Sequence, residues 1–465
     1  MNTDYNPIKL NITKFIDSLD VKDYDCFKKT LKSKFKTINF KDNHESLVLI
    51  NNNFNYNNHL LSDIEKECRS IILDKRTLEI ICYTYDDIIY NENAQNFLIE
   101  NDHLTKEIYE SYEGTQINIY HHDDEWYIST RRCIDSKKSI WNNNKSFYEL
   151  FLDCLDDTFD EFISYLNEDN IYSFVIIHHE NKNLIDYTYK FGPEYKEIIH
   201  IMTRRKNDLY EYDISDASQW GKPCSFKNSE SYKDFSKLDD YNKTEKLDYP
   251  LDFEGLIIKL YDNSNGKKHI LKLQSNSYNF FNKIKPNYSN IISGFVHLYQ
   301  NNNLKNHIDF FPSNKYIVHE NMNYDTIGII DASFKVFTSE LLEMFKYFYN
   351  LKNCSHKNSE LYEKLPVNYK KVLYKIRGIY YEKKENYINS KKNKTSLKFN
   401  MFYCLRISDI YNLLKEYNTN ELFKLFRDRQ IINSPDSLFC KLFLQFSKRC
   451  DNKLLKMINI LLQKI

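Results

Sequence analysis

The chain is poor in the residues that bend or crosslink a backbone. Its 465 residues include 8 glycines, 8 prolines and 10 cysteines. The cysteines form no Cys-x-x-Cys pair and no Cys/His cluster at zinc-ligand spacing, so the sequence implies no disulfide framework and predicts reduced thiols. Because glycine is so rare, each one is expected where the backbone needs conformational freedom or a close approach to a ligand.

Two further absences limit where the protein works. The 65 Lys and Arg residues balance the 65 Asp and Glu residues, so there is no global positive field and polyanion binding must come from local patches. No apolar run is long enough to span a bilayer, and the amino terminus lacks a basic region followed by an apolar core. We therefore expect a soluble protein, cytoplasmic or otherwise intracellular, with no membrane partner.

Gly114 closes a turn that leads into a predicted strand. Residues 110–115 read as the turn, 116–120 as a strand, 121–125 as a polar turn and 126–130 as the returning strand. The pattern predicts a β-hairpin with a glycine at its mouth. Alone, such a turn is more often plain hairpin chemistry than a nucleotide site.

The segments before and after this hairpin favour the interpretation as a nucleotide site. In order and spacing they resemble the covalent nucleotidyltransferases, most closely the phage-type ATP-dependent RNA ligases, over roughly residues 45–280. The matching segments are ECRSIILD (67–74), ESYEGT (110–115), YSFVIIHHEN (172–181), FEGLIIK (253–259) and ILKLQS (270–275).

The resemblance and the periodicity together predict an α+β fold. Residues 1–45 are expected to form an N-terminal helical segment. Residues 46–310 are expected to form a ligase-type domain of antiparallel sheets with flanking helices. Helical periodicity recurs after about residue 310, so residues 311–465 are predicted to form an all-helical domain.

In the resembled family, a lysine amine attacks the α-phosphate of ATP, and the nucleotide is then passed to an RNA 5′ end. The resemblance therefore implies ATP and Mg²⁺ as cofactors if the protein is active, and RNA ends as partners. It assigns the following residues: Ser111 at the nucleophile position; Lys272 as a catalytic cation; Arg69, Glu113, Gly114, Glu254 and Lys259 at the nucleotide; and Glu254 also at the metal.

Each of these assignments has a plainer alternative. Arg69 could be a strand-edge arginine paired with Glu65 or Glu67, and Glu254 could be an ordinary strand-end carboxylate.

Three positions depart from the family pattern. Ser111 stands where the lysine nucleophile belongs, and a hydroxyl of unperturbed pKa is no equivalent of an amine. Ser173 stands where a glutamate is expected, and Gln274 replaces the second cation of a Lys-x-Lys pair. The loss of one full charge beside a developing anion costs a few kcal/mol of transition-state stabilisation.

Two basic patches are candidate RNA contacts. Residues 129–132, which include Arg131 and Arg132, resemble the basic strand that follows the nucleophile hairpin in RNA ligases, although paired arginines are equally common as ordinary surface residues. Lys370 and Lys371 open a stretch, 370–398, with ten Lys and Arg residues against two Asp and Glu residues, interleaved with tyrosines. Basic and aromatic side chains together suit backbone neutralisation and base stacking, although a solvated lysine-rich face is the commoner explanation.

Three interpretations remain open at this point. The protein is an active RNA ligase with a displaced amine such as Lys106, Lys259 or Lys272. Alternatively, it is a catalytically inactive relative that binds nucleotide or RNA without forming a lysyl-nucleotide. In the third interpretation it is a scaffold or interaction protein that uses the same fold.

Overall fold

The structure is a computed structural model of the chain. It describes residues 8–52, 61–140, 145–181, 183–216, 220, 227–244, 247, 249–262, 267–288, 290–349, 357–392, 405–435, 437–447 and 450–464. The chain divides into two compact units, Met1–Phe281 and Asn282–Ile465, and the division falls within helix α9 (Asn276–Ile284).

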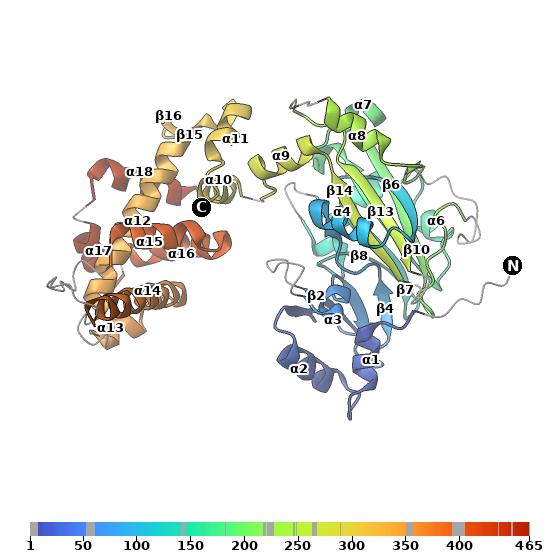
Figure 1. The fold of residues 1–465 in the computed structure, drawn as a ribbon, viewed down its shortest axis with the longest axis horizontal. Helices are drawn as coiled ribbons and strands as arrows, with labels where there is room; N and C mark the ends of the chain where they lie inside the picture. The colour runs from blue at the N-terminus through green and yellow to red at the C-terminus, as the bar shows by residue number, and fades with distance from the viewer. Residues whose placement is uncertain are drawn as a thin grey trace. The chain divides into compact units, whose positions relative to one another are not determined.

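Three sheets form the first unit (Figure 1). Sheet I has the order β1-β2-β3-β4, sheet II the order β11-β10-β9-β7-β8, and sheet III the order β12-β6-β13-β14-β5. Neighbouring strands are antiparallel except for the short pairs β10–β11 and β14–β5. The strands are β1 (Ile38–Lys41), β2 (Leu47–Asn52), β3 (Ile71–Asp74), β4 (Ile80–Tyr83), β5 (Ile89–Tyr90), β6 (Thr105–Ser111), β7 (Thr115–His122), β8 (Glu125–Thr130), β9 (Asn170–His178), β10 (Lys196–Arg205), β11 (Lys227–Asn228), β12 (Ser231–Tyr232), β13 (Gly255–Asp262) and β14 (Lys267–Gln274).

Short helices flank these sheets. They are α1 (Asn11–Asp17), α2 (Tyr24–Lys34), α3 (Asp63–Glu67), α4 (Asn91–Glu100), α5 (Phe147–Asp153), α6 (Phe159–Ile163), α7 (Thr188–Phe191) and α8 (Ser236–Lys243), with the 3-10 turns η2 (Ser136–Lys138) and η3 (His179–Asn181). The predicted α+β class with antiparallel sheets is confirmed. No helix among the described residues is both long and apolar enough to cross a membrane.

The predicted hairpin is the pair β7–β8. Asp123 and Asp124 connect the two strands, and both have positive φ values of 47° and 60°, the backbone of a two-residue turn whose twist matches antiparallel strands. The strand before Gly114 is β6, which ends at Ser111 and lies in sheet III. The strand after Gly114 is β7, which lies in sheet II. The turn at Gly114 therefore carries the chain from one sheet to the other.

A side chain at position 114 would have no room. A Cβ atom there would lie 2.3 Å from the carbonyl oxygen of Ile176 and 2.6 Å from Cγ1 of Val175. Glycine at this position therefore allows the turn to pass against β9, as the scarcity of glycine suggested.

The N-terminal segment belongs to the first unit rather than forming a body of its own. The carboxylate of Glu67 accepts hydrogen bonds from the backbone amides of Asn11 and Ile12 at 2.9 and 3.0 Å, which satisfies the first turn of α1. Apolar side chains of α1 and α2 share a core with sheet I, including Ile12, Phe27 and Ile71. The hydrogen bonds between α1 and Glu67 thus fix the backbone two residues before Arg69.

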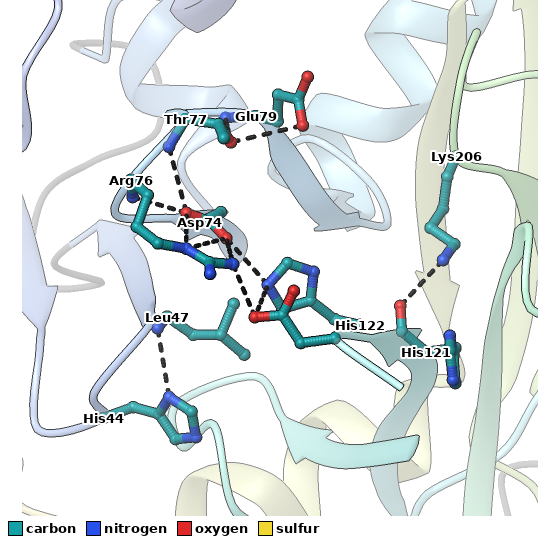
Figure 2. A network of polar contacts seen from close by, with 10 residues as sticks. His44, Leu47, Asp74, Arg76, Thr77, Glu79, His121, His122 and Lys206 are labelled. Carbon is teal, nitrogen blue, oxygen red and sulfur yellow. Dashed lines mark hydrogen bonds and ion pairs between the residues drawn. The ribbon is translucent and has the colours of Figure 1, made fainter. Parts of the chain in front are cut away.

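A polar network joins sheet I to the β7–β8 turn (Figure 2). Asp74 accepts hydrogen bonds from the backbone amides of Arg76 and Thr77 and pairs with Nη2 of Arg76 at 2.8 Å and with Nε2 of His122 at 3.0 Å. The same Arg76 nitrogen lies 2.6 Å from Asp123. Burial raises the pKa of Asp74, but Arg76 and the two amides outweigh it and lower the pKa to about 2.

This network makes part of the stability dependent on pH. The folded pKa of Asp74 lies below the unfolded value of about 3.9, so its contribution is present above about pH 4 and is lost as the pH falls towards 2. We expect Asp74→Asn to lower the free energy of unfolding by about 1 kcal/mol at pH 7, a figure discounted because Arg76 is exposed, and by clearly less at pH 3. The three tryptophans all lie before residue 282, so their fluorescence in urea reports on the first unit.

The control for this experiment is Asp63→Asn, which removes an exposed pair with Lys66. We expect a change within about 0.5 kcal/mol at both pH values. A loss in Asp74→Asn that is equally large at pH 7 and at pH 3 would contradict the assigned role of this carboxylate.

Among its described residues, the second unit is helical apart from a hairpin of β15 (Tyr316–His319) and β16 (Met322–Asp325). Its helices are α10 (Ile291–Gln300), α11 (Leu304–Phe310), α12 (Thr326–Phe348), α13 (Ser359–Glu363), α14 (Val367–Lys392), α15 (Ile407–Glu416), α16 (Thr419–Ile432), α17 (Cys440–Ser447) and α18 (Asn452–Gln463), with the 3-10 turn η5 (Pro312–Lys315). The predicted boundary at residue 310 lies later than the observed division. The reason is that α10 and α11 bury Phe295, Leu304 and Ile308 in the core of this unit.

Candidate functional site

A cavity of about 170 Å³ lies between strands of sheets II and III. Four residues assigned from the sequence line it, namely Arg69, Gly114, Lys259 and Lys272. The other lining residues are mainly aromatic or aliphatic: Tyr85, Ile88, Tyr90, Tyr109, Tyr112, Val175, Ile201, Ile257 and Ile270, together with the polar Glu110, Gln116 and Ser229. The cavity therefore combines apolar walls with cationic groups.

Strand pairing brings the central polar group together. Gly255 of β13 is paired with Ser111 of β6 on one side and with Gln274 of β14 on the other, and Glu254 immediately precedes it. Ser111 Oγ donates to Glu254 Oε2 at 2.8 Å, while Lys272 Nζ and Gln274 Nε2 donate to Oε1 at 2.6 and 3.1 Å. Glu254 is 3% exposed. It is thus the centre of the arrangement rather than a plain strand-end carboxylate.

Gly255 makes this pairing possible. Its φ is +150°, and a Cβ atom there would lie 2.1 Å from the carbonyl oxygen of Leu273. A larger residue would push β13 away from β14 and separate Glu254 from Lys272.

Lys272 is a cation rather than a free amine. Burial acts to lower its pKa, but the attraction of Glu254 more than offsets burial and the pKa is raised. A protonated amine has no lone pair for attack on phosphorus, so Lys272 in this state can stabilise charge but cannot act as a nucleophile.

Lys259 and Lys106, the other two lysines considered as nucleophiles, each pair with a carboxylate. Lys259 Nζ donates to Glu211 Oε1 at 2.8 Å and to the Ile201 carbonyl at 3.0 Å. Lys106 pairs with Asp102 at 3.0 Å and lies five residues before Ser111 on β6, about 17 Å along the strand. Lys259 is thus engaged by two acceptors, and Lys106 lies far from position 111 along the same strand.

Glu113 faces away from the cavity. Its Oε2 accepts the backbone amides of Leu184 and Ile185 at 2.7 and 2.8 Å, and its Oε1 accepts the Tyr278 hydroxyl at 2.8 Å. Burial raises its pKa, and the neighbouring charge of Glu254 adds to the effect. In this arrangement, the carboxylate positions the loop after η3 and the start of α9.

Arg69 is aimed into the cavity and poorly satisfied. It is 7% exposed, and among the described residues its guanidinium makes a single long hydrogen bond, 3.5 Å to Gln116 Oε1. The alternative of an ion pair with Glu65 or Glu67 does not hold, because those carboxylates bond to Thr37 and Ser62 and to the start of α1. A buried guanidinium with so few partners has most of its donors available for an anion.

Arg131 strengthens the positive character beside Arg69. Burial lowers the pKa of Arg131, and the nearby charges of Arg69 and Arg132 lower it further, to about 9. Mutual repulsion of this kind is relieved when an anion binds between the guanidinium groups. Asp87 is the carboxylate that partly compensates both Arg69 and Arg131.

Three residues singled out from the sequence lie elsewhere. Ser173 is fully buried on β9, where its hydroxyl donates to Asn118 Oδ1 at 2.8 Å. Lys370 and Lys371 belong to α14 in the second unit, where Lys370 pairs with Glu363 at 2.8 Å. The end of the basic stretch, residues 393–398, lies outside the described residues.

Sequence reasoning missed Glu211. This buried carboxylate pairs with Lys259, Arg204 and Lys268 at 2.8, 3.0 and 3.5 Å. Burial acts to raise its pKa, but the three cations outweigh burial and the pKa is lowered. Glu211 follows the end of β10 without any local motif, so only the tertiary arrangement reveals it.

Comparison with known proteins gives distant relatives. No family model matches the chain. The immediate-early protein ICP-46 homolog of Invertebrate iridescent virus 3 is 27% identical over 185 residues, which is 39% of this chain and 37% of that protein. A protein of Autographa californica nuclear polyhedrosis virus, named as a bifunctional polynucleotide kinase/RNA ligase, is 28% identical over 150 residues, which is 30% of this chain and 21% of that protein. The chain thus spans well under half the length of either relative.

The matches among solved structures are also distant. An archaeal ATP-dependent RNA ligase has a TM-score of 0.39 and 12% identity, with 63% of this chain and 69% of that chain covered. A structure named as an ATP-dependent DNA ligase from Aquifex aeolicus has a TM-score of 0.37 and 14% identity, with 62% and 70% covered.

Proposed function

We propose that the first unit is an RNA ligase-like nucleotidyltransferase domain that binds ATP in the cavity without forming a lysyl-nucleotide. The observation that carries this proposal is the arrangement at Glu254, where Lys272 is present as a cation and Ser111 occupies the nucleophile position. The partial similarity to the baculovirus protein named for RNA ligase activity supports the ligase-like part of the proposal.

The shape and chemistry of the cavity suit a nucleotide. The rings of Tyr85 and Tyr109 provide flat surface of the kind that packs against a base, and Ile270 adds an aliphatic wall. Arg69 and Lys272 provide cations for phosphate oxygens. Its volume of about 170 Å³ is enough for a ring system but not for a whole nucleoside triphosphate. The phosphates are therefore expected at the mouth, near Arg69.

The proposed Mg²⁺ is expected to enter with the phosphates of ATP. Glu254 Oε1 already accepts two hydrogen bonds and Oε2 accepts one, so this carboxylate has one lone pair left for a metal. Mg²⁺ is commonly held by one or two carboxylates together with substrate phosphates. The protein groups alone do not make a complete Mg²⁺ site, and the main role of Glu254 is to hold Lys272 and Ser111.

RNA ends are the proposed second ligand. Arg131 and Arg132 extend the positive region beside Arg69 and could contact RNA phosphates. On α14, Tyr374 is 68% exposed and lies beside a groove lined by Lys370, Lys371 and Lys375. An exposed tyrosine among lysines suits stacking of a base and neutralisation of the backbone.

The proposed binding of ATP is tested by an equilibrium measurement. We expect the purified protein to bind ATP saturably in isothermal titration calorimetry with Mg²⁺, and Arg69→Ala to weaken that binding by about tenfold or more, as for the loss of one charge-assisted hydrogen-bond donor. Arg205→Ala is the matched control, because Arg205 pairs with Asp208 and does not line the cavity. Absence of saturable binding of ATP, GTP and RNA would reject the proposal and support the scaffold interpretation.

The α14 surface is tested separately with single-stranded RNA. We expect Lys371→Ala combined with Tyr374→Ala to weaken binding by about tenfold and to reduce its salt dependence, because one phosphate contact and one stacking contact are lost. Lys335→Ala on α12 is the control, an exposed lysine paired with Asp331. Equal affinity and equal salt dependence of the three proteins would exclude α14 as the RNA surface.

A further inference from the structure

A second polar cluster lies at the end of β9, outside the cavity. It contains Asp153 at the end of α5 and the consecutive residues His178, His179 and Glu180, with Lys145 beside them. One ligand atom from each of His178, His179 and Glu180 can be chosen so that all three lie within 4.8 Å of one another. We call these four residues and Lys145 the β9-end cluster.

A cation already occupies the centre of this cluster. Lys145 Nζ lies 2.7 Å from Asp153 Oδ2 and 3.0 Å from Glu180 Oε1. The two carboxylates therefore converge on one point, and the ammonium group marks where a positive ion is held. With neutral imidazoles, the cluster retains one net negative charge.

His179 is oriented as a metal ligand. Its Nδ1 lies 3.3 Å from the carbonyl oxygen of Tyr195, which can only accept a hydrogen bond, so Nδ1 carries the proton. The lone pair is then on Nε2, which lies 3.9 Å from Glu180 Oε1. A histidine whose second nitrogen donates to a backbone carbonyl is the usual arrangement at protein metal sites.

His178 is buried and incompletely satisfied. Its side chain is 0% exposed, and its Nδ1 accepts the backbone amide of Glu180 at 3.1 Å, so the neutral ring carries its proton on Nε2. Among the described residues this Nε2 has no hydrogen-bond partner, and it faces Asp153 Oδ2 at 3.7 Å. A buried donor without an acceptor costs about 1–3 kcal/mol. A small approach of Asp153 would satisfy it.

We propose that a divalent transition metal ion of the zinc class binds at the point that Asp153 and Glu180 share, where the Lys145 ammonium now lies. His179, whose Nε2 lies 3.9 Å from Glu180 Oε1, is the third ligand, and His178 is a positioning residue that donates to Asp153. One imidazole and two carboxylates form a mixed nitrogen and oxygen donor set that suits Zn²⁺ better than Mg²⁺, which prefers oxygen alone. Binding displaces the Lys145 ammonium from between the carboxylates. The ion then rigidifies η3, whose last residue Asn181 donates to Thr115 at 3.1 Å, next to Gly114 of the cavity.

The experiment is metal binding by the full chain, with stoichiometry from mass spectrometry after dialysis against Zn²⁺ and ligand-field absorption after loading with Co²⁺. We expect one ion per chain that excess Mg²⁺ does not displace, and at least tenfold weaker binding in His179→Ala and Glu180→Gln. Lys145→Ala is expected to bind at least tenfold more tightly, a gain of function that misfolding cannot produce.

The controls separate this site from others. His319, at the end of β15, also lies beside a glutamate, Glu320. His319→Ala should leave Zn²⁺ binding unchanged. His122→Ala tests the Asp74–His122–Asp123 group, whose carboxylates already pair with Arg76. The proposal is overturned if neither the native protein nor Lys145→Ala retains Zn²⁺, or if binding survives His179→Ala and is lost in His122→Ala.

Discussion

Wild-type protein incubated with α-labelled ATP and Mg²⁺ or Mn²⁺ should acquire no lysyl-nucleotide. Ser111→Lys should acquire at least about 100-fold more covalent label than the wild-type background. Position 111 lies next to Glu254 at the end of β6, and the nearby cations Arg69 and Lys272 remain in the variant. A lysine there would place an amine at the nucleophile position while Arg69 and Lys272 stay in the chain. The label should be stable in alkali and labile in acid, as phosphoramidates are.

The matched control is Ser111→Arg, which adds the same charge and comparable bulk but no nucleophilic amine. It should remain unlabelled, so that label on Ser111→Lys alone reports chemistry rather than tighter ATP binding. Label on the wild type that maps to Lys106, Lys259 or Lys272 would show a displaced nucleophile and contradict the proposed function. If ATP binds but Ser111→Lys stays unlabelled, the cavity lacks more than the lysine.

The second large effect concerns stability. Glu254→Gln should lower the free energy of unfolding of the first unit by about 3 kcal/mol, because the Lys272 ammonium would be left largely buried without its counter-charge. Combining Glu254→Gln with Lys272→Met should recover most of this loss, since replacing both partners of a buried pair by neutral groups is often near neutral. Tryptophan fluorescence in urea measures both changes.

Asp102→Asn is the comparison for this pair, because Asp102 and Lys106 form an exposed bridge in the same unit. Its effect should stay within about 0.5 kcal/mol. If Glu254→Gln proves equally mild, or if the double variant is no more stable than the single one, then Lys272 and Glu254 do not form the tightly coupled pair described above.

The sequence predicted several local elements of the first unit, and four of the residues assigned to the site line the cavity. The resemblance assigned Lys259 and Lys272 to the nucleotide site, and both line the cavity. Gly114 was expected at a close approach, and it lies against β9. These features depend on residues near one another in the chain, or on strands joined by a short turn.

The other contacts of the site depend on partners far away in the chain. The amides that hold Glu113 come from Leu184 and Ile185, and its third partner is Tyr278. The pairing of Lys259 with Glu211 likewise spans 48 residues and carries no motif. The observed division precedes residue 310 because α10 and α11 bury their apolar side chains in the core of the second unit, a contact with residues far away in the chain.

The bond between Glu67 and the first turn of α1 has a thermodynamic consequence. Glu67 and Arg69 are separated by a single residue, so detachment of α1 would release the backbone that aims Arg69 into the cavity. The two events are therefore linked, and linkage is reciprocal: an anion that engages Arg69 also disfavours the opening of α1. The exchange rates of the Asn11 and Ile12 amides with solvent deuterium thus become a remote reporter of occupancy in the cavity.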